Sequence, residues 1–142
     1  MIKRVFIFVA FLSLLSGVVA QKDTYDQLKT QYDSLRKAEN HEASLLVAKQ
    51  MNTWSLKNET DTSLRYAVSL RYLGNCFYSM EKNDLAFYNY KLSIHTLKNQ
   101  NRDSHPDYAS SLNNIGVLYH NKGDYKAVEP YYKQALDIRK KA

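Results

Sequence analysis

The feature that most constrains the fold of this chain is an internal repeat. Residues 69–74 align with residues 111–116 without a gap, and the same offset of 42 residues continues through the next twenty positions. Aromatic residues lie over aromatic, small over small and aliphatic over aliphatic, as in the pairs Phe77 and Tyr119, Ala86 and Val128, Tyr90 and Tyr132, and Ile94 and Leu136. Such self-similarity is typical of an array of stacked units, each too small to fold alone.

Each unit is predicted to contain two helices. Leu112, Ile115 and Tyr119 are spaced three and four residues apart, as on one face of a helix. Gly123 and Asp124 then mark a helix end and a helix start. With only four Gly, two Pro and one Cys in 142 residues, the chain lacks the turn residues of a β-sandwich and cannot form an internal disulfide. The fold class is therefore predicted to be all-α.

Two glycines at equivalent positions predict close helix packing. Gly74 and Gly116 fall inside helices, where Gly costs about 1 kcal/mol relative to Ala. That cost is tolerated where a neighbouring helix comes near. We expect Ala86 and Val128 on the partner helices to pack against these glycines. The large Tyr90 and Tyr132 would then fill the space between hairpins.

The last repeat resembles the tetratricopeptide repeat. The resemblance rests on Leu112, Ile115-Gly116, Tyr119, Gly123-Asp124-Tyr125, Val128, Tyr132 and Ala135-Leu136. The period of 42 residues, His105-Pro106-Asp107-Tyr108-Ala109 and Glu129-Pro130-Tyr131-Tyr132 resemble the kinesin-light-chain-like subclass. The resemblance implies an α-solenoid of about three stacked antiparallel helix hairpins. The expected divisions are a degenerate repeat at 21–60, a repeat at 61–103 and the best-matching repeat at 104–142.

One position departs from this pattern, and the last helix has an apolar face without a partner. Glu81 stands where the repeat expects Gly, so we expect the turn inside the middle repeat to be shifted by a residue or two. The last helix, from Tyr125 on, carries Tyr125, Tyr132 and Ile138 on a face with nothing left to pack against. The array therefore either pairs with another chain, with self-association through this uncapped helix as one route, or forms the front of a longer protein.

The first twenty residues are predicted to be a signal peptide. Lys3 and Arg4 precede an apolar run over 5–15, and Val18-Val19-Ala20 provides small residues for cleavage after Ala20. The apolar run is shorter than the roughly 20 residues of a membrane-spanning helix. We therefore expect an exported protein, periplasmic or extracellular, with no membrane contact after cleavage. Removal of both signal cations lowers the net charge of +6, which weakens the case for nucleic acid as a partner.

No catalytic, cofactor or metal site is predicted. His41-Glu42 lacks the second His of a zinc-protease helix, since Leu45 stands in its place. The sequence contains neither a Gly-x-Ser-x-Gly elbow nor a Gly-rich phosphate loop. Cys76 is expected to be a small buried residue.

The predicted functional surface is a concave groove. In the family that the chain resembles, the first helix of each hairpin lines this groove, which implies that the peptide-binding residues are Arg71, Asn75, Tyr78, Asn113, Asn114, Val117 and His120. Asn114 is implied to hydrogen-bond the backbone of an extended peptide, since an amide both donates and accepts. Arg71 is suited to an acidic group.

Two functions remain open at this stage. The first is an exported scaffold that binds a peptide or protein segment. The second is the N-terminal sensor arm of a longer protein, whose effector, a caspase-like peptidase or a histidine kinase, would lie beyond Ala142. The two hypotheses differ in whether coding sequence follows Ala142.

Overall fold

The computed structural model describes residues 24–141, which form six helices and no strand. The helices are α2 (Tyr25–Lys37), α3 (His41–Asn58), α4 (Leu64–Ser79), α5 (Asn83–Asn99), α6 (Pro106–Asn121) and α7 (Tyr125–Lys141). The predicted signal peptide lies outside the described residues. Among the helices of residues 24–141, none is long and apolar enough to cross a bilayer.

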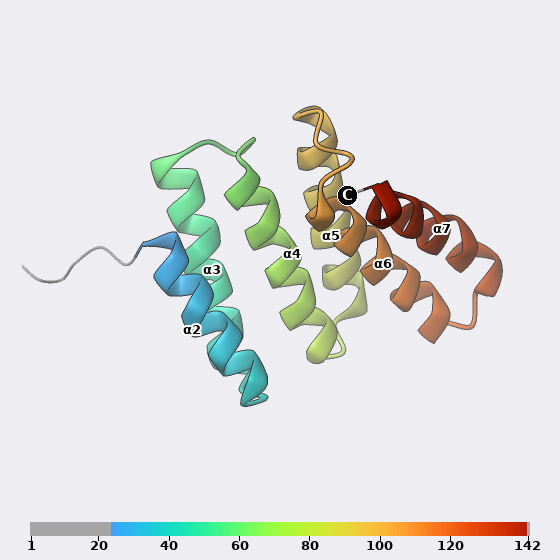
Figure 1. Ribbon diagram of the computed structural model, residues 1–142. Coiled ribbons are helices and arrows are strands. Elements are labelled where there is room, and N and C mark those ends of the chain that lie inside the picture. The colour runs from blue at the N-terminus through green and yellow to red at the C-terminus, as the bar shows by residue number, and fades with distance from the viewer. Residues whose placement is uncertain (1–23, 142) are drawn as a thin grey trace, which may run out of the picture.

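Each helix packs on the next one in the chain, so that α2–α3, α4–α5 and α6–α7 form three hairpins in a row. The helices follow one another across the molecule in chain order, with α2 and α3 at one end and α7 at the other (Figure 1). This is the solenoid arrangement that the repeat predicts, in which each unit buries its apolar face against its neighbours.

Side chains cap the helices where the sequence places polar residues before an apolar run. Ser63 Oγ accepts a hydrogen bond from the Tyr66 backbone N–H, and His105 Nδ1 accepts one from that of Asp107. Asn40 and Asp124 cap α3 and α7 in the same way. These bonds satisfy backbone donors that a helix leaves unpaired at its start, which fixes where these helices begin. α5 begins after Lys82 without a side-chain cap.

The turn inside each hairpin has one geometry throughout the chain. Glu39, Glu81 and Gly123 adopt φ values of 55°, 59° and 76°, each 42 residues after the last. In every case the next residue's N–H donates to a carbonyl five residues before it. The expected shift at Glu81 is therefore wrong. The helices on either side hold Glu81 in a left-handed conformation that normally favours Gly.

Each internal glycine receives a tyrosine ring from its own hairpin. A Cβ built on Gly74 would lie 2.5 Å from the Tyr90 ring, and one on Gly116 would meet the ring of Tyr132. The side chains nearest to the glycines are therefore Tyr90 and Tyr132, and not Ala86 and Val128 as expected. Tyr90 also belongs to a buried cluster with Ile115 of α6, so it does contact the next hairpin.

The first hairpin reverses this arrangement of large and small residues. Tyr32 of α2 stands 42 residues before Gly74, and Ala48 of α3 stands 42 residues before Tyr90. Both side chains are buried in one cluster. The ring of Tyr32 stacks on that of Tyr72 with centroids 4.4 Å apart. The large residue has moved from the second helix to the first, which keeps the hairpin filled without a glycine.

Gly74→Ala is expected to destabilise the protein by about 2 kcal/mol, because overpacking at a rigid contact outweighs the better helix propensity of Ala. Tyr90 is 2% exposed and its hydroxyl is hydrogen-bonded to Asn75, so its ring cannot move aside. Gly116→Ala is the matched control and should cost less, since Tyr132 is only half-buried. Urea unfolding measures both, and equal losses would contradict the explanation.

Glu81→Gly is expected to stabilise the protein by about 1 kcal/mol, because Gly adopts a left-handed conformation without the steric cost that Glu carries there. Glu81 is exposed, so the substitution removes no packing. The change is read from the urea midpoint at constant m-value. Glu81→Ala serves as the control, because it removes the charge but keeps the strain. A gain of the same size for Ala would assign the effect to charge.

Candidate functional site

The candidate site is a cavity of about 360 Å³ on the side of the array where the first helices of the three hairpins meet. Residues from α2, α4 and α6 line most of it, and α5 and α7 each contribute one. The lining residues are Arg36, Arg71, Asn75, Tyr78, Tyr90, Ser110, Asn114, Val117 and Arg139. No Asp or Glu is among them. The cavity is therefore positively charged.

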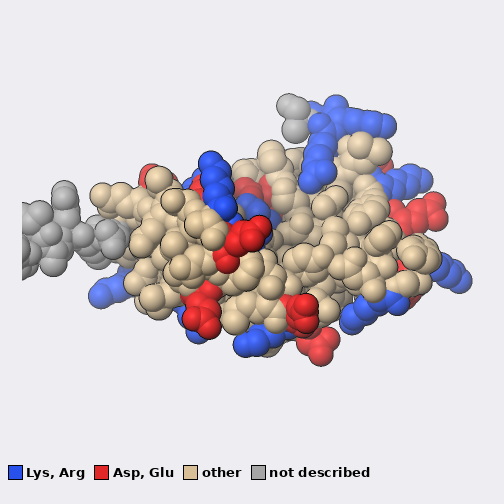
Figure 2. Space-filling model, turned by 90° about the horizontal axis from the view of Figure 1, so that it is seen from below, with Lys and Arg blue, Asp and Glu red and all other residues tan. Residues whose placement is uncertain are grey.

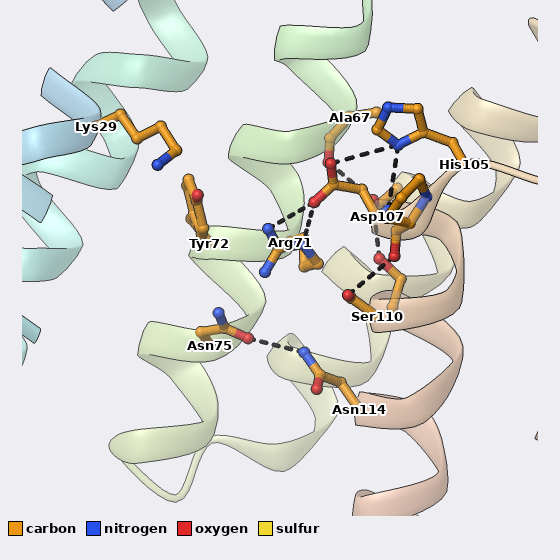
Figure 3. A network of polar contacts seen from close by, with 12 residues as sticks. Lys29, Ala67, Arg71, Tyr72, Asn75, His105, Asp107, Ser110 and Asn114 are labelled. Carbon is orange, nitrogen blue, oxygen red and sulfur yellow. Dashed lines mark hydrogen bonds and ion pairs between the residues drawn. The ribbon is translucent and has the colours of Figure 1, made fainter. Parts of the chain in front are cut away.

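An ion pair joins the second and third hairpins at one edge of the cavity (Figure 3). Arg71 of α4 donates from Nε and Nη2 to Asp107 Oδ1 of α6, at 3.1 and 2.7 Å. The Arg71 guanidinium also lies over the Tyr72 ring, 4.6 Å from its centroid. His105 Nδ1 lies 3.4 Å from Asp107 Oδ2. Asp107 thus compensates the charge of Arg71 and holds its plane in place.

Asn75 is the centre of a second link between the same hairpins. Its Oδ1 accepts hydrogen bonds from the Tyr90 hydroxyl at 3.0 Å and from Asn114 Nδ2 at 2.9 Å. Burial raises the pKa of the Tyr90 phenol above its ordinary value, so this hydroxyl remains protonated and donates. Asn114 keeps its carbonyl oxygen and one N–H for a ligand.

Arg36 and Tyr78 lie at the end of the cavity near the helix turns. Arg36 Nη1 donates to Ser79 Oγ at 2.6 Å, which connects α2 to α4. Tyr78 accepts a hydrogen bond from Asn121 Nδ2 at 2.8 Å and keeps its own hydrogen for donation. These contacts link the first hairpin to the second and the second to the third, so the cavity walls are fixed to one another.

Of the seven residues that the sequence pattern places in the groove, five line this cavity: Arg71, Asn75, Tyr78, Asn114 and Val117. Asn113 is half-exposed and lies outside it. His120 is exposed and packs its ring against Tyr125, with centroids 5.4 Å apart.

Four lining residues were not predicted. Arg36 stands 42 residues before Tyr78, so extending the repeat into the degenerate first hairpin would have found it. Ser110 precedes Asn114 by one helical turn and shares its face. Tyr90 and Arg139 come from second helices, and no sequence signal marks them as cavity residues.

Among the described residues, neither a metal cluster nor an exposed thiol is found. Residues 24–141 contain no group of three His, Cys, Asp or Glu side chains placed to hold a metal ion. Cys76 is 1% exposed, and burial raises the pKa of its thiol. The prediction that Cys76 is a small buried residue is confirmed.

Charged side chains are interspersed over the face seen in Figure 2, where Lys and Arg gather mainly at the end of α7. The last turn of that helix carries Arg139, Lys140 and Lys141. Arg139 is the one of the three that reaches the cavity.

A family model described as tetratricopeptide repeat matches residues 65–141, which is more than half of the chain. The chain therefore belongs to the tetratricopeptide repeat family, as its motifs predicted. Repeats of this family generally mediate protein–protein interaction and are typically non-catalytic scaffolds. No curated protein matches the chain at the significance level that was required.

Proposed function

We propose that this protein is an exported scaffold that binds an extended peptide or protein segment in the cavity lined by α2, α4 and α6. The observation that carries the proposal is the half-satisfied amide of Asn114 at the centre of a preformed, hydrogen-bonded cavity. A preformed site loses little conformational entropy on binding, which favours affinity. The proposal includes membership of the kinesin-light-chain-like subclass, which the 42-residue period supports.

Asn114 is the residue assigned to the peptide backbone. Its Nδ2 donates one hydrogen to Asn75, which fixes the orientation of the amide. The remaining N–H and the carbonyl oxygen match the carbonyl and N–H of one peptide unit. Val117 lies one turn further along α6 and offers an apolar contact for a side chain. The cavity thus has the groups that an extended segment requires.

Export rests on the amino-terminal sequence. A basic pair, an apolar run and small residues before Gln21 have the order of a cleaved secretory signal. Cleavage after Ala20 leaves only three residues before the capping residue Thr24 of α2, so the folded array starts almost at the new terminus. The cavity is then presented outside the cytoplasm.

A second candidate function is the recognition arm of a longer protein. A related alternative is that two copies of this chain associate through α7. Leu136 of α7 is 50% exposed, whereas Ile94, which stands 42 residues earlier, is packed against residues of α6. A further helix laid on α7, from the same chain or from a second copy, would cover Leu136 as α6 covers Ile94. An effector such as a peptidase or a kinase would then lie beyond this helix.

Asn114→Ala is expected to weaken peptide capture about tenfold, because a buried amide hydrogen bond contributes up to about 1.5 kcal/mol. Binders are first selected from a random peptide library on the wild-type protein, and their affinity for each variant is then measured. Asn113→Ala is the matched control, since Asn113 lies outside the cavity. Equal affinity for both variants, with unchanged melting temperatures, would remove the groove assignment.

The intact mass of the protein from its own cells is expected to be about 2 kDa below the 16.5 kDa of the full sequence, because a signal peptide is removed on export. Amino-terminal sequencing should begin at Gln21. A full-length mass would reject cleavage. A much larger mass would favour the recognition arm of a longer protein, and an oligomer at the cleaved mass would favour self-association.

A further inference from the structure

Within residues 24–141, two of the three arginines that line the cavity have no acidic partner. Asp107 compensates the charge of Arg71 at 2.7 Å. Arg36 is bonded to the hydroxyl of Ser79, which is neutral. Arg139 forms no ion pair or side-chain hydrogen bond within residues 24–141. The cavity therefore carries an uncompensated charge of about two positive units, because arginine stays protonated in proteins.

Arg139 departs from the repeat pattern on the last described helix, which no following hairpin covers. It stands 42 residues after Leu97, which is fully buried at 0% exposure between the second and third hairpins. In α7 the same position is exposed and directed to the cavity. A position that provides core packing in the middle repeat thus provides a cation at the end of the cavity.

The hydrogen-bonding groups that remain free in the cavity also favour an anionic ligand. Asn75 Oδ1 already accepts from two donors, and Asn114 keeps one carbonyl oxygen and one N–H. The Tyr78 hydroxyl accepts from Asn121 and keeps its hydrogen. Two guanidinium groups and this hydroxyl therefore present mainly donors. A ligand that satisfies them needs several acceptor oxygens and a negative charge of two.

We propose that the cavity binds a phosphomonoester dianion carried on a side chain of the bound peptide, with Arg36 and Arg139 as the lining cations that compensate its charge. The proposal rests on the proposed peptide-binding function and specifies its ligand. A phosphate group has a charge near −2 and three acceptor oxygens, whereas a carboxylate has a charge of −1 and two oxygens. The cavity volume of about 360 Å³ lies within the range of small-ligand sites, about 300–1,000 Å³.

The experiment measures binding of small probes to the protein by calorimetry at fixed ionic strength. The probes are O-phosphoserine and glutamate, each blocked at both ends, and inorganic phosphate. We expect blocked phosphoserine to bind about tenfold more tightly than blocked glutamate, since each charge-assisted hydrogen bond contributes more than a neutral one. Equal affinity for the two blocked residues would overturn the proposal. Inorganic phosphate binding more tightly than blocked phosphoserine would assign the site to a free anion.

Variants locate the site. Arg36→Gln and Arg139→Gln should each lower phosphoserine affinity about tenfold. Arg102→Gln is the matched control, because Arg102 is exposed outside the cavity and loses the same charge. An equal loss in the control would reduce the effect to general electrostatics and overturn the proposal. Melting temperatures verify that each variant is folded.

The pH dependence provides an independent readout. The second proton of a phosphomonoester leaves near pH 6, so phosphoserine affinity should rise between pH 5 and pH 7.5, while that of sulfate, a dianion throughout, stays constant. A parallel rise for sulfate would show that the change does not come from the phosphate group and would overturn the proposal. If library peptides bind Arg36→Gln and Arg139→Gln as tightly as wild type, the phosphate assignment fails while the peptide-binding function stands. If no peptide binds at all, the proposed function fails instead.

Discussion

The structure depends on the contact between the Tyr90 ring and the backbone of Gly74. This contact fixes how closely α4 and α5 approach, since no side chain separates the ring from the helix. It also places the Tyr90 hydroxyl within 3.0 Å of Asn75. Asn75 in turn holds Asn114 on the next hairpin. One packing constraint in the core therefore orients the polar groups of the cavity.

Tertiary structure overrides local preference where the repeat requires it. Glu39 and Glu81 adopt the left-handed conformation that Gly123 adopts easily. The helices on both sides and the hydrogen bonds that close each turn hold them in this conformation. The first hairpin keeps its packing by exchanging positions of Tyr and Ala. In both cases the spatial arrangement is conserved between repeats although the residues that produce it differ.

Much of the fold could be predicted from the sequence, because helix starts and buried faces are marked by residues that are close together in the sequence. Capping residues such as Ser63 and His105 mark helix starts, and the period of three and four marks buried faces. The partner of Gly74 could not be predicted. Ala86 and Tyr90 are one turn apart on α5, so the choice between them depends on the offset of two packed helices. Arg139 could not be assigned to the cavity, since its place depends on how successive hairpins are rotated.

The junction between the second and third hairpins is held on two sides. Facing the cavity, Arg71 pairs with Asp107 and Asn75 with Asn114. In the core, the buried Ser93 donates to the Ala67 carbonyl at 2.8 Å and lies 3.2 Å from Ser111 Oγ. Because buried polar groups are costly to separate, opening this junction would break both sets together. A ligand that contacts α4 and α6 at once therefore binds a surface whose curvature is already set, and its binding energy is not spent on ordering the array.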